Sequence, residues 1–286
     1  MDMIMNSPLE VELTAAFKGH MTPNVMIQYG HPNNPKYRFR THKDVLFNCS
    51  ATFKGKFNSR ELDIGSTITI SHENVEAIED MLRYFYLQTY APVLLPAAPM
   101  SSMQQRRRLA ARHAAVYDLA RQKVCGVSGL AELVVGQFQQ GADDALTSLD
   151  QPGNNTAKNA VRLLRMYVNL IYENDDDTWE TFEGQDTPDM IKFWPLRGLV
   201  CETAARIWLR AQRWNATPAA GQNGVQEQGE EEVEINHGDT GEDVVKKELA
   251  KLCWKYAHFA QDFARWMLIK GEVSIALGHN VKGRTR

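Results

Sequence analysis

The sequence predicts an α+β fold, in which a small mixed sheet flanked by helices is followed by an all-helical C-terminal region. Two runs with strand periodicity, at residues 25–29 and 37–40, lie on either side of a turn-forming stretch, and helix, strand and helix patterns follow them. From about residue 156 onward the apolar residues recur at helical spacing. With 286 residues, 43% of them hydrophobic, the chain is long enough for one large domain or two smaller ones.

The N-terminal part is predicted to run in the order helix, hairpin and helix. Residues 9–19 place Leu9 and Leu13 on one stripe of a short helix. Residues 25–29 and 37–40 alternate as strands do, and the turn formers between them predict a hairpin loop of roughly six residues. The next pattern is a single helix whose apolar face is formed by Leu46, Cys49, Phe53 and Phe57.

A strand at residues 66–70 and a helix from an N-cap at Ser71 to about Leu87 complete the sheet region, and the apolar stripe of this helix is Val75, Ile78, Leu82 and Phe85. Residues 90–108 contain three prolines and no period, which predicts an exposed inserted loop. A further helix then buries Leu109, Val116, Leu119 and Ala120. It breaks at Gly126, after which another helix begins.

The second region, residues 156–286, is predicted to be helical. Its first stripe is Val161, Leu164, Val168 and Ile171, and a second helix over 190–214 is kinked or begins near Pro195. Residues 215–243 carry eight acidic residues and no Lys or Arg, which predicts disorder. One last helix over 244–271 has the stripe Leu249, Leu252, Cys253, Tyr256, Phe259, Phe263 and Met267.

The composition argues against several classes of function. A net charge of −3 gives no general case for binding nucleic acid. The four cysteines (Cys49, Cys125, Cys201, Cys253) lie far apart, without zinc-ribbon spacing, and are interpreted as small buried side chains in a reducing cell. The histidines lack metal-ligand spacing, and Gly-rich phosphate loops are absent. We therefore expect no cofactor and no nucleotide chemistry.

The N-terminus has no basic region followed by a long apolar run, and no stretch of the sequence is apolar enough to span a bilayer. The expectation is a soluble intracellular protein of the cytoplasm or nucleus that does not associate with membranes.

Three polar groupings have two interpretations each. His42 and Asp44 would form an acid/base pair, or His42 packs at a strand–helix corner; side chains two positions apart on a helix face different ways, which favours packing. Arg106, Arg107, Arg108 and Arg112 would be a nuclear-import or nucleic-acid patch, or a solvated helix flank. The acidic residues 227–243 would bind a basic partner, or form a solvating linker.

A family resemblance begins at Phe39, where the residues stand as FxxHKxVLxxxSxxF (Phe39, His42, Lys43, Val45, Leu46, Ser50, Phe53). It continues through Ile68-Thr69-Ile70, Ala77-Ile78, Met81-Leu82, Tyr84-Phe85-Tyr86 and Tyr90 to Val116–Ala120 and Gly129-Leu130. This order resembles the BTB/POZ domain over about residues 20–140. Residues 1–19 precede that domain, and residues 168–174 and 259–263 resemble the helical C-terminal layout of fungal BTB proteins.

The resemblance implies a non-enzymatic protein–protein interaction module that forms homodimers or heteromers or binds cullin scaffolds. Candidate interface residues are Leu9, Leu13, Asn24, His42, Lys43, Phe57 and Glu61. In dimerising members an Asp on the first strand and a basic residue after the His line a charged pocket; here Asn24 and Lys43 stand at those positions. Cullin binders carry a hydrophobic residue two before a Glu, where this chain has Ser59 before Glu61.

Three hypotheses follow from the sequence. The first is an interaction protein that acts by self-association or scaffolding. The second is a substrate adaptor of a cullin-based ubiquitin ligase, with residues 156–286 as the receptor part. The third is a transcription-associated factor that uses Arg106–Arg108 for import or DNA.

Overall fold

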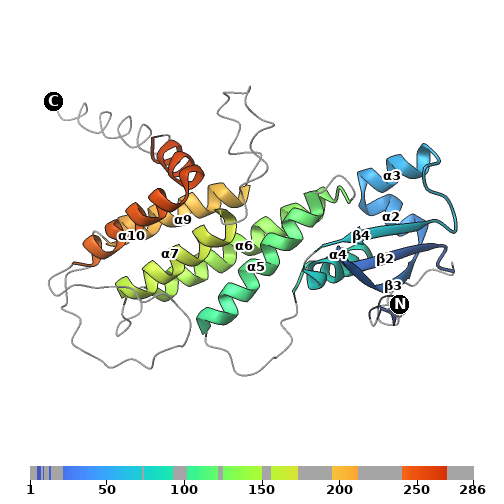
Figure 1. The fold of residues 1–286 in the computed structure, drawn as a ribbon, viewed down its shortest axis with the longest axis horizontal. Helices are drawn as coiled ribbons and strands as arrows, with labels where there is room; N and C mark the ends of the chain where they lie inside the picture. The colour runs from blue at the N-terminus through green and yellow to red at the C-terminus, as the bar shows by residue number, and fades with distance from the viewer. Residues whose placement is uncertain are drawn as a thin grey trace, which may run out of the picture. The chain divides into compact units, whose positions relative to one another are not determined.

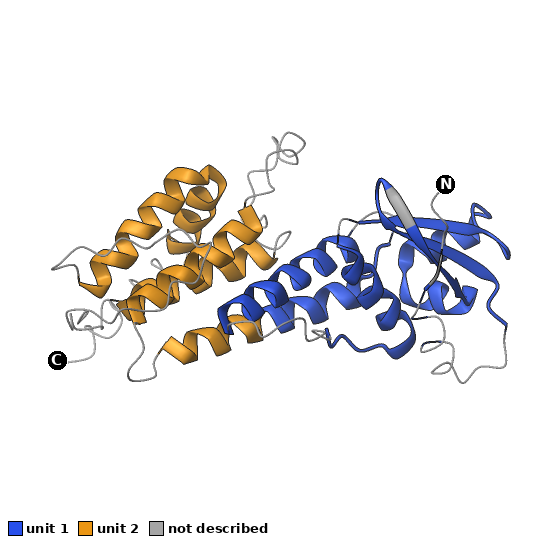
Figure 2. Ribbon diagram, turned by 60° about the horizontal axis from the view of Figure 1, so that its bottom comes forward, with its two compact units in different colours: residues 1–138 blue, residues 139–286 orange. Residues whose placement is uncertain are grey.

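The computed structural model describes residues 5–7, 9, 13, 22–72, 74–92, 102–121, 125–149, 156–172, 195–211 and 240–268. The chain divides into two compact units, residues 1–138 and 139–286 (Figure 2). In the described part of the chain every strand lies in the first unit, and the second unit is helical. The predicted order of a small mixed sheet with helices followed by helices is confirmed.

The sheet has four strands in the order β1-β3-β2-β4 (Figure 1): β1 (Met5–Asn6), β2 (Val25–His31), β3 (Asn34–Thr41) and β4 (Thr67–Ser71). β2 and β3 are antiparallel, whereas β1 pairs with β3 and β4 pairs with β2 in parallel. Alternate residues of β2, namely Val25, Ile27 and Tyr29, are buried as their periodicity predicts. β1 was not predicted from the sequence.

The predicted six-residue hairpin loop is wrong. β2 and β3 extend until His31 pairs with Asn34, which leaves only Pro32 and Asn33 in the turn. The register shifts between Tyr29 and Gly30, and Gly30 has a φ of 149°. This conformation suits glycine, so the residue that looked like a turn former is a bulge inside the strand.

The sequence predicts a single helix with the stripe Leu46, Cys49, Phe53 and Phe57. The structure has two helices there, α2 (Lys43–Cys49) and α3 (Ala51–Asn58). Ser50 between them is extended, with φ −136° and ψ 121°. Its hydroxyl accepts the N–H of Phe53 at 3.1 Å and donates to the carbonyl of Cys125. The stripe still faces the core, since Leu46, Phe53 and Phe57 are buried. Cys49 is half-buried.

α4 (Val75–Leu87) begins later than predicted, because its N-cap is Asn74 rather than Ser71. The Asn74 amide oxygen accepts the N–H of Ala77 at 3.1 Å, whereas Ser71 is the last residue of β4. Ile78, Leu82 and Phe85 are buried as predicted, and Val75 is half-buried.

α5 (Ser102–Arg121) corrects the predicted loop over residues 90–108, because its first seven residues occupy 102–108. Residues 93–101 of that loop lie outside the described residues. Val116, Leu119 and Ala120 are buried as predicted, whereas Leu109 is half-buried. The break at Gly126 is confirmed, with a φ of 54°, and α6 (Ser128–Leu149) follows. The boundary between the two units falls inside α6.

In the second unit α7 (Thr156–Tyr172), α9 (Pro195–Ala211) and α10 (Gly241–Lys255) pack against one another pairwise (Figure 1). α9 begins at Pro195, one of the two predicted alternatives, and proline is favoured at a first helical position. Of the α7 stripe, Val161, Leu164 and Val168 are buried and Ile171 is half-buried.

The last predicted helix over 244–271 is also two helices. α10 ends at Lys255, Tyr256 is extended, and residues 257–268 form the next helix. Leu249, Leu252 and Phe259 are buried, but Met267 is 37% exposed. Thr240 and Asp243 form a capping box, so the predicted disorder is wrong for residues 240–243. Residues 215–239 lie outside the described part.

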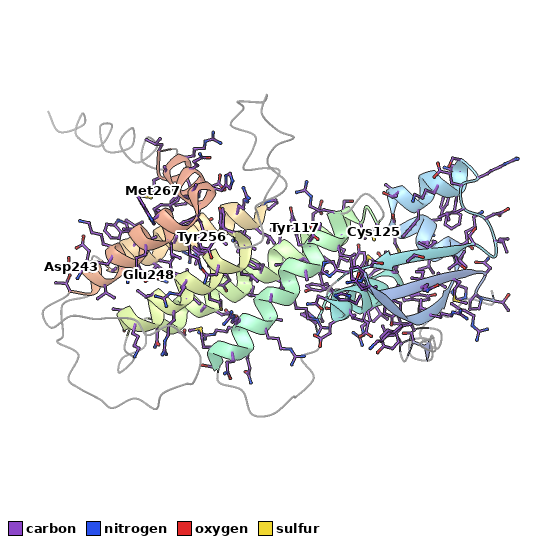
Figure 3. All side chains as sticks on the ribbon, in the orientation of Figure 1. Tyr117, Cys125, Asp243, Glu248, Tyr256 and Met267 are labelled. Carbon is purple, nitrogen blue, oxygen red and sulfur yellow. The ribbon has the colours of Figure 1, made fainter. Side chains whose placement is uncertain are left out.

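Side-chain contacts connect the helices of the second unit (Figure 3). Glu248 of α10 accepts two hydrogen bonds from Arg165 of α7, at 2.8 and 3.0 Å. The Tyr256 hydroxyl donates to Asn169 at 3.0 Å. These contacts fix the rotation of α10, so that Val245, Leu249 and Leu252 face the bundle.

Candidate protein-binding surface

The N-terminus of α2 is capped by a residue from another element. Asn24, just before β2, accepts the backbone N–H of Lys43 on its amide oxygen at 2.8 Å. His42, the N-cap residue, makes no side-chain cap, so Asn24 satisfies a donor that the start of the helix leaves open. The contact between Asn24 and Lys43, expected in a partner interface, is therefore made within one chain and through the backbone of Lys43.

The side chain of Lys43 lies on an aromatic ring. Its ammonium is 5.0 Å from the ring centroid of Phe57, which is 6% exposed. Lys43 itself is half-buried. Within the described ranges, no ion pair of Lys43 is present. The corner therefore presents a half-buried lysine whose positive charge lies beside an apolar ring.

His42 is packed inside the domain. It is 2% exposed, and its Nδ1 lies 3.0 Å from the hydroxyl of Tyr86, which is also 3.1 Å from Thr41 Oγ1. Asp44 is exposed on α2, so the structure does not bring these two side chains together. This agrees with the packed interpretation of His42.

The seven candidate interface residues differ in accessibility. Leu9, Leu13, His42 and Phe57 are buried within the chain, Asn24 and Lys43 are half-buried, and Glu61 is exposed. The structure brings Asn24, Lys43 and Phe57 together. Glu61 accepts a hydrogen bond from the hydroxyl of Ser59 at 3.2 Å. The contact of these residues with a partner stays a prediction.

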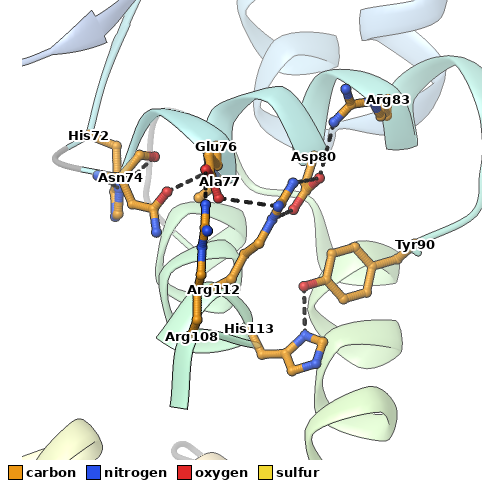
Figure 4. A network of polar contacts seen from close by, with 10 residues as sticks. All are labelled: His72, Asn74, Glu76, Ala77, Asp80, Arg83, Tyr90, Arg108, Arg112 and His113. Carbon is orange, nitrogen blue, oxygen red and sulfur yellow. Dashed lines mark hydrogen bonds and ion pairs between the residues drawn. The ribbon is translucent and has the colours of Figure 1, made fainter. Parts of the chain in front are cut away.

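A buried ion pair between α4 and α5 was missed by the sequence analysis (Figure 4). Arg112 donates to both carboxylate oxygens of Asp80, at 2.5 and 2.6 Å, and the two residues are 4% and 3% exposed. Burial lowers the pKa of Arg112, but hydrogen bonding to Asp80 and the carboxylate charges outweigh it, so the net pKa is raised.

The same network takes in Glu76, which lies 3.2 Å from Arg112 and 2.8 Å from Arg108. Two of the four arginines of the predicted basic cluster are thus engaged in ion pairs with α4. Of the three arginines that the transcription-linked hypothesis uses, Arg106–Arg108, Arg108 is one of the paired residues. The pairing could have been noticed, because Asp80 and Arg112 each lie among the apolar positions of their helix at a spacing of three or four.

His113 lies beside this network (Figure 4). It is 3% exposed, and its Nδ1 is 2.7 Å from the hydroxyl of Tyr90. Burial, with a smaller contribution from Arg112, lowers the pKa of His113 to about 4. The imidazole is therefore neutral at physiological pH, and its Nδ1 shares a hydrogen bond with the Tyr90 hydroxyl.

Residues 15–112 match the family model of the BTB/POZ domain. The chain contains a BTB/POZ domain. BTB/POZ domains are interaction domains rather than enzymes, so the chain carries a protein–protein interaction module and has protein partners. A search of curated proteins finds no match to the chain.

The BTB/POZ match ends inside α5, whereas the predicted resemblance reaches residue 140 and the first compact unit ends at residue 138. The corner of Asn24, Lys43 and Phe57 and the Asp80–Arg112 pair both lie within the matched span. The fungal-type layout of residues 156–286 stays a prediction.

Other kinds of site find little support. Over the described residues, no group of His, Cys, Asp or Glu could hold a metal ion. None of the helices in the described part of the chain is both long and apolar enough to span a membrane. The four cysteines are free thiols; Cys125 and Cys201 are buried, and Cys49 and Cys253 are half-buried.

Proposed function

We propose that the chain self-associates or scaffolds other proteins through its BTB/POZ domain, predicted over residues 20–140, and that it acts without catalysis. The observation that carries this proposal is the BTB/POZ match together with the position of Lys43. Lys43 is a half-buried residue whose ammonium lies 5.0 Å from the ring centroid of Phe57, and within the described ranges it has no carboxylate partner.

An acidic side chain of a partner protomer or partner protein would complement Lys43. A lysine on a half-buried corner gains more from a carboxylate than a fully exposed lysine does, because the surrounding dielectric is lower. Asn24 cannot supply this charge, since its amide is neutral and already accepts the backbone N–H of Lys43. The acidic residue of the partner must therefore lie at a different position from the first-strand Asp of dimerising BTB domains.

Light scattering of the full chain tests this function. The wild-type chain should have a mass above the 32.4 kDa of one chain at micromolar concentration. Lys43→Glu should shift the mass toward the monomer, because it places like charges together. Lys36→Glu, the same change at an exposed position of β3, should leave the mass unchanged.

A wild-type chain that is monomeric throughout and recovers no partner by pull-down would contradict the proposal. Thermal unfolding of both variants controls for loss of fold.

A second candidate is a cullin adaptor, with residues 156–286 as its substrate-receptor part. The observation that favours it is the loop after α3, where Glu61 is exposed and Ile64 is 67% exposed. This loop thus presents an acid and an apolar side chain close together in sequence. Ser59 replaces the expected hydrophobic residue, and its hydroxyl also lies 3.1 Å from the Lys56 carbonyl.

Co-purification from the native cell tests this candidate. A cullin should accompany the wild-type chain and be reduced several-fold by Ile64→Ala, as expected for an apolar anchor. Absence of any cullin from the wild-type sample would exclude the adaptor function.

A further inference from the structure

The two edges of the sheet in the first compact unit differ in character. At one edge β3 contains Pro35 and the charged residues Lys36, Arg38 and Arg40. The two-residue strand β1 covers only Tyr37 and Arg38 of this edge. Proline, charged side chains and very short edge strands are devices by which soluble proteins prevent a sheet from pairing with another chain. The β3 edge is therefore protected against such pairing.

The other edge is β4, whose neighbour in the sheet is β2 (Figure 1). Its five residues, Thr-Ile-Thr-Ile-Ser, include no charged residue and no proline, and its pairing with β2 runs without a register shift. Threonine and isoleucine are favoured in strands. Among the described elements, β2 is the one that packs closely along β4. β4 thus has none of the devices found at the opposite edge.

The hydrogen bonds between β4 and β2 fall on alternate residues. The carbonyl of Ser66, just before β4, accepts from the N–H of Met26 at 3.0 Å. The N–H of His72, just after β4, donates to the carbonyl of Gly30 at 3.1 Å. Because successive residues of a strand alternate in direction, the even-numbered positions from 66 to 72 face β2.

The N–H and C=O groups of Thr67, Thr69 and Ser71 therefore point to the open edge. The side chains of these three residues are exposed, whereas Ile68 and Ile70 are 6% and 2% exposed and belong to the core. An unprotected row of outward backbone groups is a template for pairing with another strand.

This edge is complementary to a second copy of itself. When two β4 strands are placed antiparallel about a two-fold axis at Thr69, Thr69 lies opposite Thr69 and Thr67 lies opposite Ser71. Each opposed pair exchanges N–H to C=O hydrogen bonds. An axis perpendicular to the sheet keeps Ile68 and Ile70 of both copies on the same face, so neither core is exposed. Hydroxyl side chains then face one another across the strands and no like charges meet.

We propose that β4 is an edge-to-edge interface between two copies of this chain, centred on Thr69. The inference rests on the proposed function in requiring self-association, and it names a surface separate from the corner of Lys43. A second copy is the occupant because it supplies the same outward groups in the register that β4 needs. Strands of five residues bury little area, so this interface alone is weak and pairs copies in the upper micromolar range.

Disulfide crosslinking of the full chain tests the register. The Cα atoms of a hydrogen-bonded antiparallel pair lie about 5.5 Å apart, which a disulfide can span. Thr69→Cys should therefore form a covalent dimer under mild oxidation. Ser71→Cys is the matched control, because the two copies of position 71 lie roughly 14 Å apart along the strands. The dimer of Thr69→Cys should form at least about tenfold faster than that of Ser71→Cys, and the wild type gives the background of the natural cysteines.

Sedimentation equilibrium measures the pairing without a crosslink. Thr69→Pro removes an outward N–H but no bond to β2, and Thr69→Lys places two ammonium groups opposite each other. Both variants should self-associate several-fold more weakly than the wild type, whereas the neutral variant Thr69→Gln should not. Circular dichroism and thermal unfolding establish that each variant is folded. Both experiments are repeated in the Lys43→Glu background, where the crosslink at position 69 should persist.

The interface is overturned if Thr69→Cys forms a dimer no faster than Ser71→Cys, or if Thr69→Pro and Thr69→Lys self-associate as the wild type does. Loss of the crosslink in the Lys43→Glu background overturns β4 as an interface of its own. Self-association that Thr69→Lys weakens and Lys43→Glu leaves unchanged supports the β4 interface and contradicts the role of Lys43, so the two proposals fail separately.

Discussion

Ser50 and Gly126 show how single residues set the local structure of the first compact unit. The Ser50 hydroxyl accepts from Phe53 and donates to the carbonyl of Cys125, seventy-five positions away. Gly126 follows Cys125 with a φ of 54°, and a Cβ there would collide with the side chain of Thr52. Sequence periodicity could not reveal this contact, because it joins residues far apart in the chain. It explains why the predicted single helix is broken at Ser50.

His113 makes the stability of the first compact unit depend on pH. Its folded pKa of about 4 lies below the ordinary value of 6.5, so the folded state binds this proton less readily than the unfolded state does. The contribution of His113 to the free energy of unfolding is therefore complete above about pH 6.5 and is lost as the pH falls toward 4. Between about pH 7 and about pH 5 we expect a loss of roughly 2 kcal/mol from this residue. Urea unfolding of the full chain at both pH values measures it.

His113→Gln should reduce this pH dependence, because glutamine can accept from Tyr90 but does not titrate. His31→Gln is the matched control at an exposed position and should keep the wild-type dependence. An equal loss of stability in wild type and His113→Gln would contradict the assignment.

At the scale of helices and strands, α4 and α5 are joined by the buried Asp80–Arg112 pair. The pair is bidentate and almost fully desolvated. Asp80→Ala leaves the Arg112 charge without its main partner and should destabilise the chain by about 3 to 5 kcal/mol. Chemical denaturation followed by circular dichroism gives the free energy of unfolding.

The double variant Asp80→Leu, Arg112→Met separates pairing from packing. Replacing a buried pair with apolar side chains of similar volume is often close to neutral. We therefore expect the double variant to recover most of the stability lost in Asp80→Ala. A double variant as unstable as the single one would show that the ion pair itself is required.

The faces of the helices could be predicted from the sequence better than their ends. Ile78, Leu82 and Phe85 of α4 are buried as their spacing indicates. Its start was misplaced because Asn74, and not Ser71, accepts the open N–H group. The predicted start of α5 was too late, because three prolines suggested a loop up to residue 108, whereas the helix begins at Ser102. The spacing of apolar residues indicates which face of a helix is buried, whereas the position of a helix end depends on one capping residue or one distant contact.

At the scale of the whole molecule, the folding unit is longer than the BTB/POZ match. Cys125, Val127, Leu130 and Val134 follow the matched span and are 0% exposed. Each buried aliphatic side chain contributes about 1.5 to 3 kcal/mol, and a domain has only about 5 to 15 kcal/mol in total. These residues are therefore required for a stable domain.

Two fragments test this requirement. A fragment of residues 1–149, which keeps α6 complete, should unfold cooperatively on heating. A fragment of residues 1–121 lacks those four residues and should be unfolded or aggregated. Circular dichroism during heating distinguishes them, and equal midpoints for the two fragments would contradict the prediction.

The order of elements was predictable because periodicity and turn residues are local properties. The candidate surface was predicted only as a set of residues. The sequence could not show that Asn24 bonds to the backbone of Lys43 or that Phe57 lies beneath its ammonium. It also gave no sign that Trp254, outside every predicted stripe, is 93% exposed.

The distribution of the cysteines has a practical consequence. Each compact unit contains one half-buried thiol and one buried thiol: Cys49 and Cys125 in the first, Cys253 and Cys201 in the second. Burial raises the pKa of Cys125 and of Cys201 to about 12, so neither reacts with a thiol reagent until its surroundings open. Each unit therefore contains a natural buried thiol whose labelling depends on the opening of that unit. The labelling rates of Cys125 and Cys201 would time the opening of the two units separately, without any engineered probe.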